Sequence, residues 1–78
     1  MAIGTPVHAM MAGQVIVRTF SSSAGEMLDI RHDNGFRTRY LHLEEGSYRV
    51  HRNDFVYRGM HIARACCHYL IAIKTRAN

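Results

Sequence analysis

Long apolar runs are missing from this chain of 78 residues. No stretch reaches the roughly 18 consecutive apolar residues that a membrane-spanning helix needs, so we expect no membrane segment. The first residues, MAIGTPVHAMMAG, contain neither the basic start nor the apolar centre of a secretory signal peptide. As written, the sequence therefore predicts a cytoplasmic protein, and a chain this short predicts a single domain over residues 1–78.

Lysine is almost absent, because Lys74 is the only one and arginine supplies the other basic residues. The formal net charge is +4, and the planar arginine fork suits carboxylates and phosphates, so an acidic partner fits the composition. The arginines are scattered rather than gathered into a run, and scattered basic residues are typical of solvated surfaces. The pattern therefore argues against a nucleic-acid partner.

Cysteine is also scarce, and the two cysteines, Cys66 and Cys67, are adjacent. A bridge between neighbours would be strained, so the sequence predicts no internal disulfide. Free thiols favour a reducing compartment or burial in the core. Cys66 and His68 could face the same side of a strand, but two ligands make a poor metal site.

Helical periodicity is missing as well. Turn signals divide the chain at short intervals into segments rich in β-branched and aromatic residues, which is typical of an all-β domain. The sequence therefore predicts a small, mainly antiparallel sheet. The expected strands are Gln14–Phe20, Glu26–Asp33, Phe36–Leu43, Phe55–Tyr57 and His68–Lys74.

The strongest hairpin signal is DNG at residues 33–35. Its Asn-Gly pair accepts the positive φ values of a tight primed turn, so we pair Glu26–Asp33 with Phe36–Leu43. Asparagine also accepts the left-handed region better than most residues, which suits Asn53 in a later turn. Apolar residues recur after the hairpin at a spacing that would bury one row: Val50, Val56 and Ile62.

Four stretches follow one another in a recognisable order: GTPVHAMMAGQVI, IRHDNGFRTRYLHL, VHRNDFVYRGMHI and a final strand led by His68. In sequence and spacing they resemble the lysostaphin-like (LytM-type) zinc metallopeptidases, which cut peptide cross-bridges in peptidoglycan. The resemblance runs from Gly4 to about Ile73. It implies a barrel-sandwich type of sheet with a groove across it, a peptidoglycan peptide as partner, and zinc as the cofactor of an active member.

The resemblance also implies which residues would do the chemistry. His42, in YLHL, matches one histidine that assists the attacking water, and His68 matches a second. Thr38 and Tyr40 are expected to share the strand face of His42 and to form a polar-aromatic binding strip. Without zinc nothing polarises a carbonyl, so His42 and His68 are expected to be inactive.

The zinc ligands that the resemblance implies are missing. Catalytic zinc needs about three protein ligands and one open position. The family has a histidine and an aspartate upstream of GTPV, for which a chain starting at Met1 leaves no room, and a third histidine where Leu70 stands. We therefore expect no metal site. Only ARACC separates Ile62 from His68, so a loop that would wall the groove is also expected to be deleted.

These departures favour a non-catalytic, zinc-less domain that acts as a binding or interaction module. One alternative is a peptidoglycan-directed zinc metalloendopeptidase, or part of one, whose ligands come from elsewhere. Another is a small regulatory or inhibitory protein that binds an acidic protein surface. A lipoyl or biotinyl carrier fits less well, because Lys74 lies at a strand end rather than at a hairpin tip. Exposed sheet edges also predict a homodimer.

Overall fold

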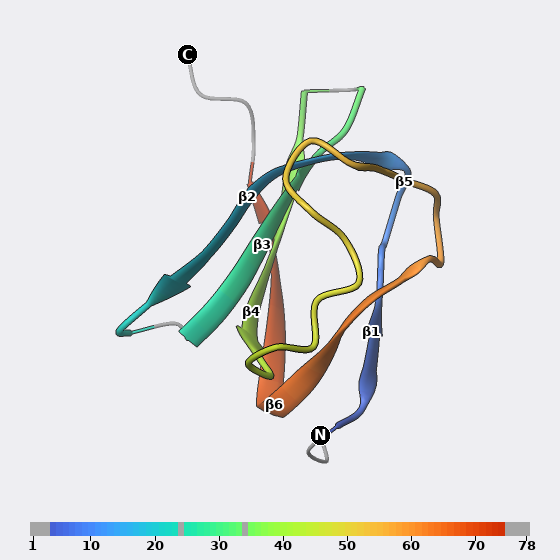
Figure 1. Ribbon diagram of the computed structural model, residues 1–78. Helices are drawn as coiled ribbons and strands as arrows, with labels where there is room; N and C mark the ends of the chain where they lie inside the picture. Colours follow the sequence, from blue (N-terminus) through green and yellow to red (C-terminus); the bar gives the residue numbers. More distant parts are fainter. Residues whose placement is uncertain (1–3, 24, 34, 75–78) are drawn as a thin grey trace.

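The computed structural model of the chain folds into one curled antiparallel sheet (Figure 1). It describes residues 4–23, 25–33 and 35–74, and for residues 67–70 and 74 it describes the backbone alone. The sheet order is β1-β6-β4-β3-β2-β5. In chain order the strands are β1 (Pro6–His8), β2 (Gly13–Ser21), β3 (Gly25–Arg31), β4 (Arg37–Leu43), β5 (Phe55–Val56) and β6 (His61–Lys74).

The all-β prediction is confirmed, and the described residues include no helix that could span a membrane. Strands β2 to β5 lie within a residue or two of their predicted bounds. The final strand differs, because β6 already begins at His61 rather than at His68. The short β1 was not predicted from the sequence. Its pairing partners lie in the first residues of β6, which were not expected to form a strand.

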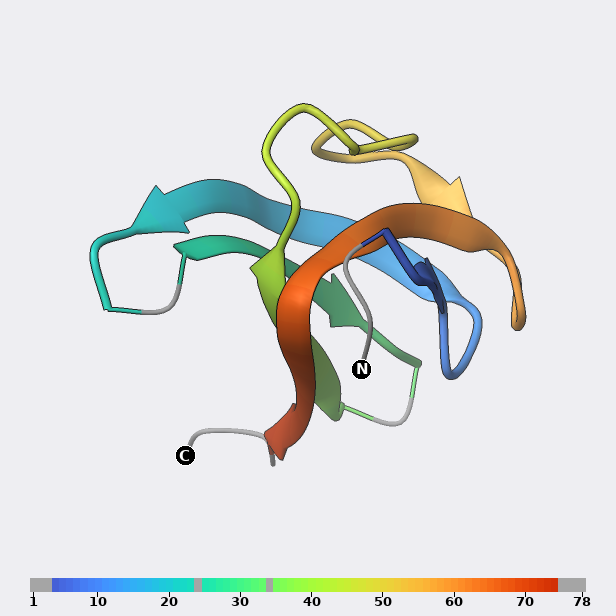
Figure 2. The same cartoon turned by 90° about the horizontal axis from the view of Figure 1, so that it is seen from below.

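The long strand β6 serves two partners. Its first part pairs with β1, and its last part pairs with β4 along most of that strand's length. The strand bends between the two, as the arched orange ribbon in Figure 2 shows. The family resemblance implies a loop between Ile62 and His68, where this sequence has only ARACC. In the structure these residues belong to the continuous strand β6, which crosses the curled sheet.

The β3–β4 hairpin has the predicted strands but not the predicted turn. The Gly35 N–H donates to the His32 carbonyl (3.1 Å) and the His32 N–H donates to the Phe36 carbonyl (2.9 Å), so the loop covers residues 33–35. Gly35 has φ +85°, which suits a three-residue hairpin loop that ends in a left-handed glycine. The tight primed turn was therefore wrong, and the register moves by one residue.

The core lies between the inner face of the sheet and the segment 44–54, which crosses over that face (Figures 1 and 2). The apolar row that the sequence predicted is confirmed, because Val50, Val56 and Ile62 are all buried. Asn53 has φ +79°, as its turn position predicted. The core cluster comprises Val7, Ala9, Val15, Leu28, Ile30, Tyr40, Leu43, Val50, Val56, Ile62, Ala63 and Ala65.

The start of β2 requires a glycine because two backbones approach closely there. A Cβ atom on Gly13 would lie 2.3 Å from the Arg31 carbonyl oxygen and 2.9 Å from His32 Nδ1. The first of these neighbours is backbone and cannot give way cheaply. The glycine of AGQVI therefore allows the β1–β2 loop to dock against the end of β3.

The cysteine prediction was wrong. Cys66 is disulfide-bonded in the structure, and Cys67 is the only other cysteine of the sequence. Residues 66–69 lie where β6 leaves regular pairing with β4, between the Leu43–Ala65 and Leu41–Leu70 pairs.

Candidate functional site

Thr38 and Tyr40 lie in the core rather than on a binding surface. Tyr40 is fully buried and Thr38 is almost so. Their hydroxyl groups lie 2.9 Å apart, and the Met10 N–H donates to the Tyr40 oxygen at 3.0 Å. The structure therefore uses the two hydroxyl groups inside the fold, to fasten the β1–β2 loop to β4.

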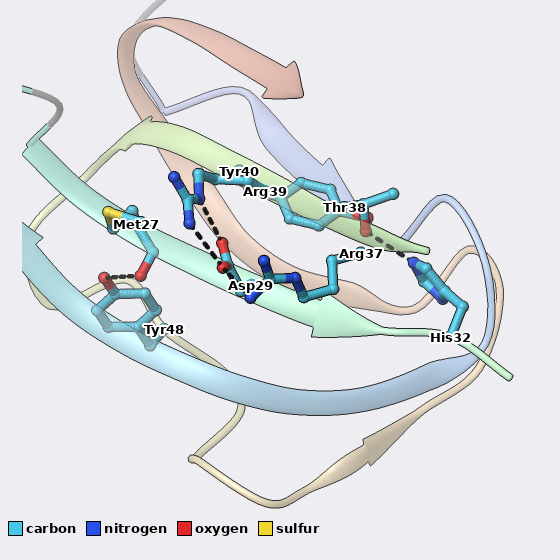
Figure 3. A network of polar contacts seen from close by, with 8 residues as sticks. All are labelled: Met27, Asp29, His32, Arg37, Thr38, Arg39, Tyr40 and Tyr48. Carbon is cyan, nitrogen blue, oxygen red and sulfur yellow. Dashed lines mark hydrogen bonds and ion pairs between the residues drawn. The ribbon is translucent and has the colours of Figure 1, made fainter. Parts of the chain in front are cut away.

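His32 continues this chain of hydrogen bonds (Figure 3). Its Nδ1 lies 2.7 Å from the Ala12 carbonyl oxygen, which can only accept, so Nδ1 carries a proton. Its Nε2 lies 2.9 Å from the Thr38 hydroxyl oxygen, and that hydroxyl group in turn donates to the Tyr40 oxygen. Both ring nitrogens are satisfied in a nearly buried side chain, so His32 positions the loop and the hairpin relative to each other.

His42 lies on the opposite face of β4, because a bulge interrupts the alternation of the strand. Leu41 and His42 together stand against Met27, between the Leu28–Tyr40 and Glu26–Leu43 pairs. Leu43 is buried whereas Leu41 and His42 are half-buried, so the bulge turns His42 to the outer face. The prediction that His42 shares a face with Thr38 and Tyr40 is therefore wrong.

The backbone of His42 has φ +60°, which is uncommon for a residue other than glycine. This conformation costs about 1 kcal/mol, which the pairing on both sides of the bulge must offset. Opposite His42 on β6 lie residues 66–69, since Leu41 pairs with Leu70 and Leu43 pairs with Ala65. The side chain of His68 is outside the described part of the structure, so the predicted approach of the two rings stays a prediction.

The outer face of β3 and β4 carries a buried ion pair (Figure 3). Arg39 holds both oxygens of Asp29, with Nε at 2.8 Å from Oδ1 and a terminal nitrogen at 3.0 Å from Oδ2. Arg37 approaches the same carboxylate from the other side, at 3.9 Å. The hydrogen bond to Asp29 raises the pKa of Arg39, so the ion pair favours the charged form of the guanidinium.

A depression of 440 Å³ lies at the end of β3, beside the edge strand β5. Its lining is mixed in character, with an arginine, a carboxylate and an amide beside the exposed ring of Phe55. None of Thr38, Tyr40 and His42 lines it. The lining residues are Ala12, Gly13, Gln14, Arg31, His32, Asp33, Phe55 and Val56.

A comparison with models of protein families identifies the family of this chain. The model of peptidase family M23 matches residues 1–69. The chain belongs to peptidase family M23. Two curated relatives, the peptidoglycan DD-endopeptidases ShyB and ShyA of Vibrio cholerae, are 41% and 39% identical to this M23 chain over 63 and 62 residues. The aligned residues are 81% and 80% of this chain but 14% of each relative.

Solved structures agree with the family. Lysostaphin from Staphylococcus simulans superposes with a TM-score of 0.88 and 25% identity, over 100% of this chain and 35% of its own. A zinc-containing peptidase from Vibrio cholerae gives 0.79 and 32%, over 97% of this chain and 26% of its own. The M23 chain therefore has the fold of these peptidases, and it spans about a third of their length or less.

The M23 family implies a zinc ion, and the described residues do not fit one. Within the described ranges, no group of three or more histidine, cysteine, aspartate or glutamate side chains could hold a metal. At the position where a zinc-binding histidine is expected, the sequence has Leu70, which carries no donor atom. Catalytic zinc needs about three protein ligands, and the described histidines are not part of any such set.

The sequence did not reveal the arginine cluster of the outer face. With the tight turn that Asn-Gly favours, Arg31 would stand opposite Thr38. The longer loop instead aligns Arg31 with Arg37 and Asp29 with Arg39. A one-residue change of register exchanges the faces of a strand, so the turn length was the missing signal.

Proposed function

We propose that this M23 chain is a non-catalytic domain that binds peptide of the peptidoglycan type. The observation that carries the proposal is the loss of the donor set: Leu70 stands where the resemblance places a zinc ligand, and the described residues hold no three-ligand cluster. Without a metal, His42 has no polarised water or carbonyl on which to act. Binding is the part of the family's activity that needs no zinc.

The retained fold supports a role in binding. The apolar row, the inner hydrogen-bond chain and Gly13 maintain the core and the loop contacts beneath the outer face. The outer face and the nearby depression expose arginine, amide and aromatic groups, which are the side chains that recognise peptides. The curated relatives are named as peptidoglycan endopeptidases, which suggests the class of peptide.

Zinc analysis combined with a cleavage assay tests this function. The purified chain is dialysed against zinc, its metal content is measured by mass spectrometry, and it is then incubated with cross-linked muropeptides. We expect less than stoichiometric zinc and no new peptide ends, with an active M23 endopeptidase as the positive control. Stoichiometric zinc together with turnover would refute the proposal.

The second candidate is a zinc metalloendopeptidase, or part of one, whose remaining ligands come from outside this sequence. The identity of 41% to a DD-endopeptidase and the presence of His42 favour it. Leu70 argues against it, since a leucine at that position removes a ligand whatever the other segments supply. The same zinc and cleavage measurements separate the two candidates.

A further inference from the structure

Basic residues occupy one register row across three neighbouring strands. Arg31 on β3 pairs with Arg37 on β4, and the backbone of Arg37 pairs in turn with that of Lys74 on β6. Like charges directly opposite each other on neighbouring strands destabilise a sheet. Among the described residues, Arg31 has no ion pair that would relieve this repulsion. The Arg31–Arg37 pairing is therefore electrostatically unfavourable, and the one carboxylate that approaches it, Asp29, lies 3.9 Å from Arg37.

Asp29 relieves only part of this repulsion, because it is shared between Arg37 and Arg39. Its two oxygens are held bidentately by Arg39, so one arginine already satisfies this buried carboxylate. Arg37, at 3.9 Å, is beyond hydrogen-bond distance of Asp29, and within the described ranges its guanidinium makes no hydrogen bond. Arg37 thus adds a positive charge that the Asp29–Arg39 pair does not require, and about a third of its side chain is exposed (36%).

The ion pair instead gives the face a fixed geometry. Figure 3 shows the guanidinium groups of Arg37 and Arg39 on either side of Asp29. Because the Asp29 side chain is 1% exposed, it anchors Arg39 against the sheet without presenting its own charge to solvent. The exposed edges of both guanidinium groups are left for an acceptor from outside the chain.

The basic row continues into the depression at the end of β3. Gln14 pairs with Arg31 on one side and with Phe55 on the other. Arg31 lines the depression together with Gln14 and Phe55. One carboxylate, that of Asp33, also lines it, so the depression has an acceptor for a ligand N–H as well as a cation for an acidic group.

We propose that Arg31 and Arg37 bind a carboxylate of a peptide ligand, and that the neighbouring residue of that peptide lies in the depression against Phe55. This inference rests on the proposed function and specifies the chemistry that the peptide must carry. A carboxylate accepts two parallel N–H bonds from an arginine fork, and its charge relieves the repulsion across the row. The net charge of +4 favours an acidic ligand at long range as well.

A pair of matched peptides tests the inference. The probes are a synthetic peptidoglycan stem tetrapeptide with free carboxylates and the same peptide with every carboxylate amidated, each titrated calorimetrically into the full chain. We expect amidation to weaken binding about tenfold or more. Arg37→Gln should weaken binding of the acidic peptide by a similar factor and leave the affinity for the amidated peptide unchanged.

Arg52→Gln is the matched control, because Arg52 lies exposed in the β4–β5 segment and loses the same charge. It should change the affinity for the acidic peptide by less than about twofold. Equal binding of both peptides by the unaltered chain would overturn this inference alone. Binding of neither peptide would overturn the proposed function with it, and tighter binding of a single-stranded oligonucleotide than of the acidic peptide would show that the row serves a different partner.

Discussion

The two faces of the β3–β4 hairpin differ in how completely their polar side chains are paired within the fold. On the inner face, Thr38 and Tyr40 are buried. Hydrogen bonds link the Met10 N–H, the two hydroxyl groups, the His32 ring and the Ala12 carbonyl group, so each of these polar groups has a partner within the fold. On the outer face, Arg31 stands opposite Arg37 and has no ion pair among the described residues, while Arg37 shares Asp29 with Arg39 at the longer distance of 3.9 Å. Alternate residues of the same strands thus specify the fold on one side and remain available to a ligand on the other.

The largest difference between the faces should appear when the same side chain is truncated on each. Leu28 is fully buried on the inner face, so Leu28→Ala should lower the free energy of unfolding by about 3 kcal/mol. Leu41 is half-buried on the outer face, and Leu41→Ala should cost about 1 kcal/mol. Urea unfolding followed by circular dichroism measures both. Equal losses would mean that the outer face is packed as tightly as the core.

Breaking the ion pair should be the next largest effect. Arg39→Gln leaves the Asp29 carboxylate buried with only the distant Arg37 for compensation, so we expect a loss of about 2 kcal/mol. The double variant Asp29→Asn with Arg39→Gln should recover at least half of that loss, because no charge is then buried. Additive losses in the same urea experiment would contradict a coupled pair.

Thr38→Val tests the inner hydrogen-bond chain at nearly constant volume. It removes the hydroxyl group that bonds His32 Nε2 and leaves a buried nitrogen without a partner, at a cost of about 1 to 2 kcal/mol. Thr19→Val, at an exposed position of β2, is the matched control and should change stability by less than about 0.5 kcal/mol. Hydrogen exchange at the β1–β2 loop amides should quicken in the first variant alone.

The smallest effect concerns Tyr48, which joins the segment 44–54 to the β2–β3 hairpin. Burial and the hydrogen bond to Glu26 raise the pKa of Tyr48 above its ordinary value of 10.0. The unfolded chain therefore loses this proton first, and the free energy of unfolding should fall as the pH rises above about 10. Urea unfolding between about pH 9 and about pH 11 should show that the free energy of unfolding falls less steeply in Tyr48→Phe than in the unaltered protein. An identical fall in both proteins would exclude Tyr48 as its source.

The sequence predicted the inner face better than the outer one. Apolar alternation and glycine positions predicted four of the strands, the β3–β4 pairing and the buried row of Val50, Val56 and Ile62. These features depend on local pattern. The start of β6 and the existence of β1 depend on each other, because the two segments pair although they lie far apart in the sequence. No local sequence pattern indicates such a pairing.

The candidate site was harder to predict because one bulge and one turn decide its faces. Strict alternation placed His42 beside Thr38 and Tyr40, whereas the bulge at Leu41 and His42 puts it on the other side. The three-residue loop before Phe36 aligned Arg31 with Arg37 in the same way. Both the bulge and the longer loop shift the register by one residue. Such a shift moves every following side chain to the opposite face of the sheet.

Calorimetric titration of the full chain with the free-acid stem peptide, performed with and without EDTA and followed by mass spectrometry of the recovered peptide, separates metal-independent binding from cleavage. We expect saturable binding of equal affinity in both buffers and intact peptide after incubation. Cleaved peptide in the absence of EDTA, and intact peptide in its presence, would show a working metal centre and would refute a non-catalytic role.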